Sequence, residues 1–375
     1  MEAGLYIHIP FCEKKCDYCD FYSITALDRI DSFISALQKE IEIRSPIFSD
    51  YTFHTIFFGG GTPSLLKEKQ VLQIWDTLTS NLSFIEKPEI TVEANPGTLT
   101  HSKLSFLKNI GFNRLSLGVQ SFNPDELTFL GRIHSAEDVY ENFSFAREAG
   151  FSNINIDLMT AFPGITLDSF KKSLGETIRL RPEHISCYTL IFEPGTVFHR
   201  KMLKGQLNPL EDAEEASYYR LASAILKENG YHHYEISNFS IGENNLCKHN
   251  LIYWNHKPYL GLGPSAHSFF NNQRHANKRS LSAYLDALDM GNLPIDFQEN
   301  LSDDDLIFEY MILNLRLQKG INLSEFRNRF GVDCSERFNS KIKYLSENNL
   351  IEVDDRYLRL SEKGWMFADS IAAYF

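Results

Sequence analysis

The sequence has neither a long apolar run nor an excess of basic residues. No stretch reaches the roughly 18 to 20 apolar residues that a membrane-spanning helix needs, so we expect no integral membrane segment. Acidic side chains outnumber basic ones by 49 to 37, a net charge of -12, which argues against nucleic acid as a partner. Residues 1–11 lack the basic start and long apolar centre of a signal peptide, so we expect a cytoplasmic protein.

Cysteine is scarce, with six in 375 residues, yet three of them lie close together. Cys12, Cys16 and Cys19 follow C-x3-C-x2-C spacing, and thiolate is a soft ligand that suits an iron-sulfur cluster or zinc. A structural zinc site needs a fourth ligand, commonly from a second C-x-x-C or H-x-x-x-H pair, and no such pair follows. The spacing therefore favours an iron-sulfur cluster. Alternation along the preceding strand-like run decides whether His8 also faces it.

The residues around these cysteines, YIHIPFC followed by CDYCDF, resemble the radical S-adenosylmethionine (SAM) superfamily. They are similar in particular to the branch that contains oxygen-independent coproporphyrinogen III dehydrogenase (oxidase) and the HemW haem chaperones. The resemblance implies a [4Fe-4S] cluster on Cys12, Cys16 and Cys19, with one open iron that chelates SAM. It also implies that one electron from the cluster cleaves SAM to a deoxyadenosyl radical, chemistry that the cofactors supply and the protein aims.

Short β-rich runs alternate with helix-compatible stretches from residue 5 to about residue 235. The expected strands are Leu5–Ile9, Thr55–Phe58, Glu89–Glu93, Arg114–Val119, Asn153–Leu158 and His184–Leu190. The expected helices are Asp31–Arg44, Lys67–Leu78, Ser102–Asn109, Ala136–Ala149, Ser169–Arg179 and Ala213–Glu228. This alternation predicts an α/β fold with a parallel sheet, and the resemblance implies a partial (β/α)6 barrel. Such barrels carry their chemistry at the C-terminal ends of the strands.

The second and third strands end in candidate site residues. FFGGGTPS places Gly60, Gly61 and Thr62 after the second strand, where glycine lets a ligand approach the main chain closely. TVEANPG ends the third strand with Glu93. From the residues alone, a tight barrel turn and a satisfied structural acid are equally good interpretations. The resemblance implies that the glycine segment takes the amino group of SAM and that Glu93 contacts SAM.

Later strand ends add further polar residues. Gln120 ends the fourth strand, and Arg132 follows in the next loop, where its guanidinium is either a carboxylate partner or a solvated surface group. Asp157 lies among apolar residues and needs partners if it is ionised. Because polar residues converge at the ends of parallel strands, we expect these three residues to form the far side of the SAM pocket, with Ile191 near the end of the sixth strand. Tyr6 in the first strand matches a SAM-contacting Tyr of the family.

Two blocks beyond the barrel carry the remaining candidates. HNLIYW contains His249, Tyr253 and Trp254; imidazole is a common haem ligand, and flat rings suit an apolar macrocycle. A buried core histidine in a bracing loop is the open alternative, and the thiol of Cys247 is another candidate iron ligand. GLGPSAHS resembles a family loop that closes against the cofactor cavity, with His267 at its tip.

Composition divides the chain into three parts. We expect a radical SAM core barrel at residues 1–235, an extension carrying both blocks at 236–299 and a C-terminal domain at 300–375. Charged helices and a short terminal hairpin, LIEVDDRYLRL, predict a small winged-helix-like α+β domain, and the family carries a HemN-type domain of this kind. DNA binding is the alternative for that shape, but it needs a basic recognition helix, which this acidic chain lacks.

Two functions stay open at this point. By the resemblance, the dehydrogenase carries an additional Cys two positions after the third and a substantial segment before the loop. Here Phe21 takes that position, and only eleven residues precede Cys12. HNLIYW matches the HNxxYW signature of the haem chaperones. The resemblance thus implies a chaperone that transfers haem to an unidentified acceptor protein and uses an electron donor, with homodimerisation open. Radical decarboxylation of porphyrinogen propionates is the alternative.

Overall fold

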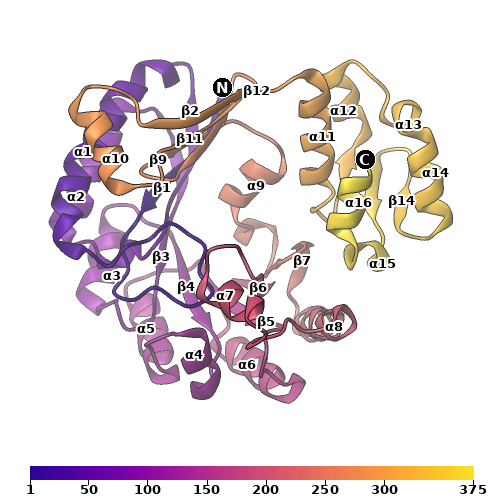
Figure 1. Cartoon of the computed structure of the whole chain (residues 1–375), viewed down its shortest axis with the longest axis horizontal. Coiled ribbons are helices and arrows are strands. Elements are labelled where there is room, and N and C mark those ends of the chain that lie inside the picture. The colour runs from indigo at the N-terminus through magenta and orange to yellow at the C-terminus, as the bar shows by residue number, and fades with distance from the viewer.

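The computed structural model describes all 375 residues, as a large α/β part and a smaller C-terminal part (Figure 1). The strands of the large part are β1 Glu2–Ile9, β2 Thr52–Gly60, β3 Phe84–Ala94, β4 Arg114–Gln120, β5 Ile154–Thr160, β6 His184–Thr189, β7 His232–Glu235, β8 Asn238–Ser240, β9 Tyr259–Leu262, β10 His267–Phe270, β11 Gln273–Asn277 and β12 Ile295–Asn300. They form one sheet in the order β12-β11-β10-β9-β1-β2-β3-β4-β5-β6-β8-β7.

Strands β1 to β6 run parallel to their neighbours, as the alternation predicted. The helices between and after them are α1 Ile30–Arg44, α2 Glu68–Asn81, α3 His101–Asn109, α5 Ala136–Glu148, α6 Leu167–Leu180 and α8 Asp212–Glu228. Helices α1, α2, α3, α5 and α6 lie along the outer side of the curved sheet (Figure 1). The predicted α/β fold class with a partial parallel barrel is therefore confirmed.

The first strand shows how the sequence sorts side chains between the two faces of the sheet. Leu5, Ile7 and Ile9 are fully buried in the large core cluster. Tyr6 and His8 alternate with them along the strand, so they point to the inner face of the barrel. The inner face therefore holds polar groups, whereas the outer face is sealed by apolar contacts with the helices.

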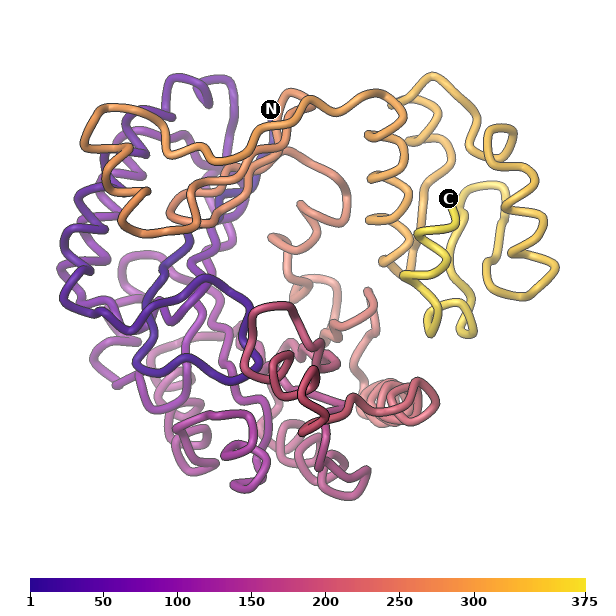
Figure 2. Tube along the Cα trace, in the orientation of Figure 1, coloured from indigo at the N-terminus to yellow at the C-terminus, as the bar shows by residue number.

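The sheet continues past the six parallel strands on both sides. β9 pairs in parallel with β1, and β10, β11 and β12 follow in antiparallel order. On the other side, β8 and β7 follow β6 in antiparallel order. The sheet does not close into a ring, because β12 and β7 are its two ends. The C-terminal part stands beside this open side (Figure 2).

The C-terminal part has its own core cluster of 13 buried residues. Its elements are α11 Asp303–Asn314, β13 Ile321–Asn322, α12 Leu323–Phe330, α13 Cys334–Arg337, α14 Asn339–Glu347, β14 Ile351–Val353, β15 Tyr357–Leu360, α15 Glu362–Trp365 and α16 Ala368–Tyr374. The three strands form a separate sheet in the order β13-β15-β14. The hairpin is present as predicted, but the expectation that it is terminal is wrong, because α15 and α16 follow it.

Four further short helices were not predicted from the sequence: α4 Pro124–Leu130, α7 Val197–Leu203, α9 Lys248–Trp254 and α10 Leu281–Asp289. Helix α9 carries the HNLIYW block. No helix of the chain combines the length and apolar character required to cross a membrane. The boundaries expected at residues 235 and 299 stay predictions.

Candidate functional site

The three clustered cysteines lie on the loop between β1 and α1, and backbone hydrogen bonds close the base of this loop. The N–H of Cys12 donates to the carbonyl of Ile24 at 3.0 Å, and the N–H of Ile24 donates to the carbonyl of Pro10 at 2.8 Å. Further along, the N–H of Cys19 donates to the carbonyl of Cys16 at 3.2 Å. All three cysteines are free thiols. The loop is thus folded without any help from a disulfide.

The donor set on this loop consists of three cysteines, the ligand type of iron-sulfur clusters. Nowhere in the chain do three His, Cys, Asp or Glu side chains gather closely enough to hold one metal ion. Burial raises the pKa of the Cys19 thiol to about 11 in the chain by itself.

The glycine segment after β2 is joined to the cysteine loop by backbone hydrogen bonds. The N–H of Gly61 donates to the carbonyl of Ile9 at 2.8 Å, and the N–H of Thr62 donates to that of Phe11 at 2.7 Å. A Cβ on Gly61 would come within 2.6 Å of the Phe11 carbonyl oxygen, so only glycine permits this approach. Gly60 takes a left-handed backbone with φ +105°. The backbone at Gly60 and Gly61 therefore requires glycine whether or not a ligand binds there.

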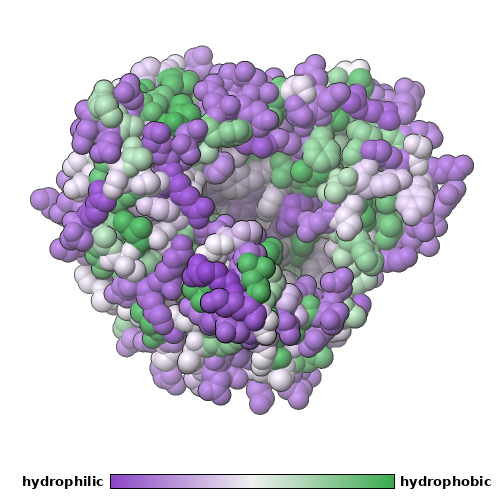
Figure 3. Space-filling view, viewed as in Figure 1, coloured by the Kyte–Doolittle hydropathy of each residue, from purple (hydrophilic) through white to green (hydrophobic).

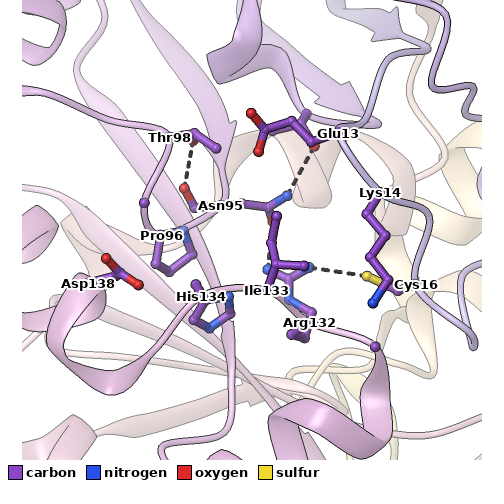
Figure 4. A pocket seen from close by; sticks show the side chains of 13 residues that line it. Glu13, Lys14, Cys16, Asn95, Pro96, Thr98, Arg132, Ile133, His134 and Asp138 are labelled. Carbon is purple, nitrogen blue, oxygen red and sulfur yellow. Dashed lines mark hydrogen bonds between the residues drawn. The ribbon is translucent and has the colours of Figure 1, made fainter.

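A relay of polar side chains links two of the cysteines. Thr62 Oγ1 donates to Cys12 Sγ at 3.5 Å and accepts from Asn95 Nδ2 at 3.0 Å. Asn95 Oδ1 accepts from Arg132 Nη2 at 2.6 Å, and Arg132 Nη1 lies 3.7 Å from Cys16 Sγ. Figure 4 shows Arg132 directed at Cys16 in a pocket of about 250 Å³. The relay fixes a positive charge beside a predicted thiolate ligand.

Two carboxylates lie at the inner face of the barrel near the glycine segment. Glu93 Oε2 accepts from the N–H of Gly60 at 3.1 Å. Burial, and then the nearby charge of Asp157, raise the pKa of Glu93 to about 8. Asp157 accepts from Asn155 Nδ2 at 2.7 Å and from Ser116 Oγ at 3.3 Å, while burial raises its pKa as well. The structure thus brings Gly60, Glu93 and Asp157 into one neighbourhood that attracts positive charge.

Other predicted contacts line the same inner face. Gln120 ends β4 with φ +68°, and its Oε1 accepts from the Tyr188 hydroxyl at 2.6 Å. His8 Nε2 donates to the Tyr22 carbonyl at 2.7 Å, so its Nδ1 accepts from the Tyr6 hydroxyl at 3.0 Å. Both ring nitrogens of His8 are thereby occupied. His8 is a buried support of Tyr6 in this arrangement, with no free nitrogen for the cysteine loop.

Two residues of the predicted set lie at exposed positions. Ile191 is 66% exposed in the segment between β6 and α7. His267 begins β10, is exposed, and makes no side-chain hydrogen bond within the chain. A Cβ on Gly263, four positions earlier, would lie 2.5 Å from the His8 carbonyl oxygen, so the GLGPSAHS loop packs closely on β1. The structure places Ile191 and His267 outside the hydrogen-bonded groups described above.

His249 is enclosed by the protein. Its Nδ1 pairs with Thr55 Oγ1 at 2.7 Å, its Nε2 pairs with the Tyr253 hydroxyl at 2.8 Å, and its ring stacks on Phe57 at 5.0 Å. Burial, and then the positive charge of Arg114, lower the pKa of His249 to about 3, so the ring is neutral. Both nitrogens are engaged, and this conformation offers none to a haem iron. It favours the buried core histidine that the sequence left open.

The alternative iron ligand in this block is buried too. Cys247 is 1% exposed, and burial raises the pKa of its thiol to about 12. Below α9, Glu89 accepts from the N–H of Lys248 at 3.2 Å and from that of His249 at 3.0 Å. Arg114, 2% exposed, supplies positive charge to Glu89 from the neighbouring strand. This neutral thiol and its surroundings suit a structural role under α9.

Sequence reasoning missed Asn95, Glu89 and Tyr188. Asn95 belongs to the NPG turn directly after Glu93, and hydrogen bonds through its side chain connect Thr62 with Arg132. Glu89 begins an expected strand, and no local pattern indicates that its carboxylate accepts hydrogen bonds from the N-terminus of α9, some 160 residues later in the chain. Tyr188 alternates with Cys187 in β6, so period-two alternation alone would have placed it on the inner face.

Comparison with known proteins decides the family. The model of the radical SAM superfamily matches residues 6–176, and that of the HemN C-terminal domain matches residues 301–367. The heme chaperone HemW of Bacillus subtilis is 37% identical over 373 residues, which cover 99% of this chain and 98% of that protein. The chain belongs to the HemW family of radical SAM proteins.

Two further proteins support this assignment. The heme chaperone HemW of Lactococcus lactis is 33% identical over 99% of this chain and 96% of its own length. Coproporphyrinogen III oxidase (HemN) of Escherichia coli, a radical SAM enzyme, has a solved structure that matches with a TM-score of 0.88 and 26% identity, covering 100% of this chain and 89% of that one. Membership of the superfamily implies a [4Fe-4S] cluster and SAM.

Proposed function

We propose that this chain is a haem chaperone. It binds haem as cargo, holds a [4Fe-4S] cluster with exchangeable SAM, and transfers haem to an acceptor protein. The observation that carries the proposal is similarity over nearly the whole chain to two relatives named heme chaperone HemW. The acceptor is a protein still to be identified, an electron donor serves the cluster, and the chain works in the cytoplasm, alone or as a homodimer.

The residues of the barrel mouth support the cofactor part of this proposal. Cys12, Cys16 and Cys19 would hold the cluster, and Gly60 to Thr62 with Glu93 would receive the amino end of SAM. A carboxylate and backbone carbonyls suit an ammonium group, whereas Arg132 suits a carboxylate. Gln120, Asp157, Tyr6, Ile191 and His267 complete the proposed SAM contacts. When bound, the cluster supplies an open iron and an electron for SAM cleavage.

Coproporphyrinogen III oxidation is the second candidate, because the HemN structure matches the whole chain at 26% identity. One residue weighs against it. Where that enzyme carries an additional cysteine by the resemblance, this chain has Phe21, which is 65% exposed and offers no ligand atom. Phe21 lies outside the C-x3-C-x2-C set, so Cys12, Cys16 and Cys19 are expected to bind the cluster under both functions.

The two functions separate in one assay on the full chain with a reconstituted cluster. We expect haemin to give a saturable Soret band, and expect incubation with SAM, reductant and coproporphyrinogen III to leave the porphyrinogen unchanged by mass spectrometry. Transfer is read by separating the two proteins after mixing with an apo-haem protein and measuring the Soret band of each, with haem-free chain as the control. Formation of protoporphyrinogen would overturn the chaperone proposal in favour of the oxidase.

A further inference from the structure

Asn95 lines the pocket beside Cys16 together with Arg132, and both ends of its side-chain amide are engaged (Figure 4). Its Oδ1 accepts from Arg132 Nη2 at 2.6 Å, and its Nδ2 donates to Thr62 Oγ1 at 3.0 Å. A guanidinium has donors only, so the oxygen of the amide must face Arg132 and the NH2 group must face Thr62. The orientation of the Asn95 amide is therefore fixed by its partners.

The Asn95 amide determines what its two partners offer to the cysteine sulfurs. Because Asn95 donates to Thr62 Oγ1, the single hydroxyl hydrogen of Thr62 is free to donate elsewhere, and Cys12 Sγ lies 3.5 Å away. Asn95 engages Nη2 of Arg132, whose Nη1 lies 3.7 Å from Cys16 Sγ. Asn95 thus holds one donor beside each of two cysteine sulfurs.

A turn that is anchored to α5 holds Asn95 in this place. Residues 95–98 read N-P-G-T, the N–H of Thr98 donates to the Asn95 carbonyl at 3.1 Å, and Gly97 has φ +85°. Proline second and glycine third, with positive φ at the glycine, match a type II turn. Asn142 of α5, which is 1% exposed, accepts from the N–H of Gly97 at 2.8 Å. The amide is therefore placed by the backbone and not only by the two groups that it orients.

Donors beside cysteine sulfurs affect how readily an iron-sulfur cluster takes up an electron. The reduction potential of such a cluster depends on its net charge, its solvent exposure and the hydrogen bonds to its sulfurs. An added electron makes the cluster more negative, and a nearby guanidinium or hydroxyl hydrogen stabilises that form. Figure 3 shows the molecule hollowed between the sheet and the C-terminal helices, and water in such a hollow screens charges across it. Groups in contact with the sulfurs therefore have the largest effect.

We propose that Asn95 is a positioning residue that raises the reduction potential of the [4Fe-4S] cluster by holding Thr62 on Cys12 and Arg132 on Cys16. The inference rests on the cluster part of the proposed function and adds the control of electron uptake. In this step an external one-electron reductant is oxidised and the cluster gains its electron, while the cysteine ligands stay bound. Asn95 exchanges neither proton nor electron; it fixes which donors face the sulfurs.

The test measures the potential directly, on the full chain with its cluster reconstituted and without SAM. Titration with dithionite, followed by electron paramagnetic resonance, gives the ratio of reduced to oxidised cluster at each potential. We expect Asn95→Leu, which keeps the size but loses both hydrogen bonds, to lower this ratio roughly tenfold at a fixed potential, a shift of about 59 mV toward more negative values. Thr62→Val, which removes only the hydroxyl, should shift the potential in the same direction by less.

Asn113→Leu is the matched control. Asn113 Oδ1 accepts from the N–H of Ile90 at 2.9 Å and its Nδ2 donates to the Pro88 carbonyl at 2.8 Å, so its amide also bonds at both ends, but to backbone groups of β3. We expect this variant to melt at a lower temperature with an unchanged potential. The double variant of Asn95→Leu and Thr62→Val should shift the potential by less than the two single shifts added together, because both changes affect the same donor.

The outcomes separate this inference from the proposal on which it rests. If the unaltered chain gives no signal of a reduced cluster, the cluster part of the proposed function is wrong. If it gives the signal and Asn95→Leu, with normal iron content, has the same potential, only the role of Asn95 is wrong. An equal shift in Asn113→Leu, or additive shifts in the double variant, would also contradict that role.

A second substitution covers the case in which Asn95→Leu does not retain its iron. Asn95→Asp keeps the size of the side chain and the bond with Arg132. Its carboxylate accepts from the Thr62 hydroxyl, which then no longer donates to Cys12. We expect the potential of this variant to fall as well, and an unchanged potential with normal iron content would overturn the inference.

Discussion

At the scale of single residues, the cysteines divide into two groups by surroundings. Cys12, Cys16 and Cys19 share one loop, whereas Cys187, Cys247 and Cys334 are buried in separate places. We expect alanine at any of the first three positions to remove most of the iron and sulfide, because two thiolates hold a cubane cluster poorly. Alanine at Cys187, Cys247 or Cys334 should leave both unchanged. Anaerobic iron and sulfide assays measure this, and equal loss in all six variants would contradict it.

Arg132 gives a second prediction at this scale. Its guanidinium bonds Asn95 and reaches Cys16, so its removal takes positive charge away from the barrel mouth. We expect Arg132→Ala to weaken SAM binding by on the order of tenfold, the loss of one charge-assisted contact, while iron content stays normal. Calorimetric titration of the reconstituted protein measures it. Arg179→Ala, on the exposed face of α6, is the control with unchanged SAM affinity.

Glu93 predicts a pH dependence of stability. Its pKa in the folded chain is about 8, above the ordinary value of 4.5, so stability present below pH 4.5 is lost as pH rises through 8. Glu93→Gln cannot ionise and escapes this loss. Without SAM, we expect the variant to melt a few degrees above the unaltered chain at pH 9 and close to it at pH 5. A melting difference that shrinks between pH 5 and pH 9 would contradict the assigned burial.

At the scale of elements, α9 depends on a distant strand. Glu89 of β3 accepts the first two N–H groups of α9, which a helix cannot satisfy by itself. We expect Glu89→Ala to lower the free energy of unfolding by about 2 to 4 kcal/mol, since it also leaves Arg114 buried without this carboxylate. Urea denaturation measures the change. Glu86→Ala, exposed on the same strand, should stay within about 0.5 kcal/mol.

The sequence predicted the repeated elements well and the isolated ones poorly. Strands such as β4 and β6 and helices such as α1 have clear periodicity, because one face packs on the large core. Helix α9 has seven residues and buries a histidine, so neither its length nor an apolar stripe distinguishes it from a loop. Two sets of hydrogen bonds depend on which strands become neighbours: those that join Thr62, Asn95 and Arg132, and those from α9 to Glu89. The local sequence pattern does not say which strands become neighbours.

At the scale of the whole molecule, Glu309 links the C-terminal part to the barrel. It bonds Arg274 of β11 and His256 after α9. We expect Glu309→Gln to increase amide exchange in α11 on the order of tenfold, because losing a charge-assisted bond worth about 1.5 kcal/mol frees that helix to open. Exchange in α2, far from this contact, should not change. The control is Glu299→Gln, whose carboxylate lies 4.0 Å from Arg274 on the exposed strand β12; equal exchange in both variants would contradict the assignment.

The place of β1 in the sheet has a consequence for synthesis of the chain. One edge of β1 pairs with residues 52–60, but the other edge waits for residues 259–262. At about 5 to 20 residues per second, roughly 10 to 40 s of translation separate the two partners. During that interval the strand beside the cysteine loop has a free edge, which can pair with the wrong chain. The strand beside the cysteine loop is therefore paired on both edges only after residues 259–262 have been made, and slowing elongation lengthens the period in which the nascent chain aggregates.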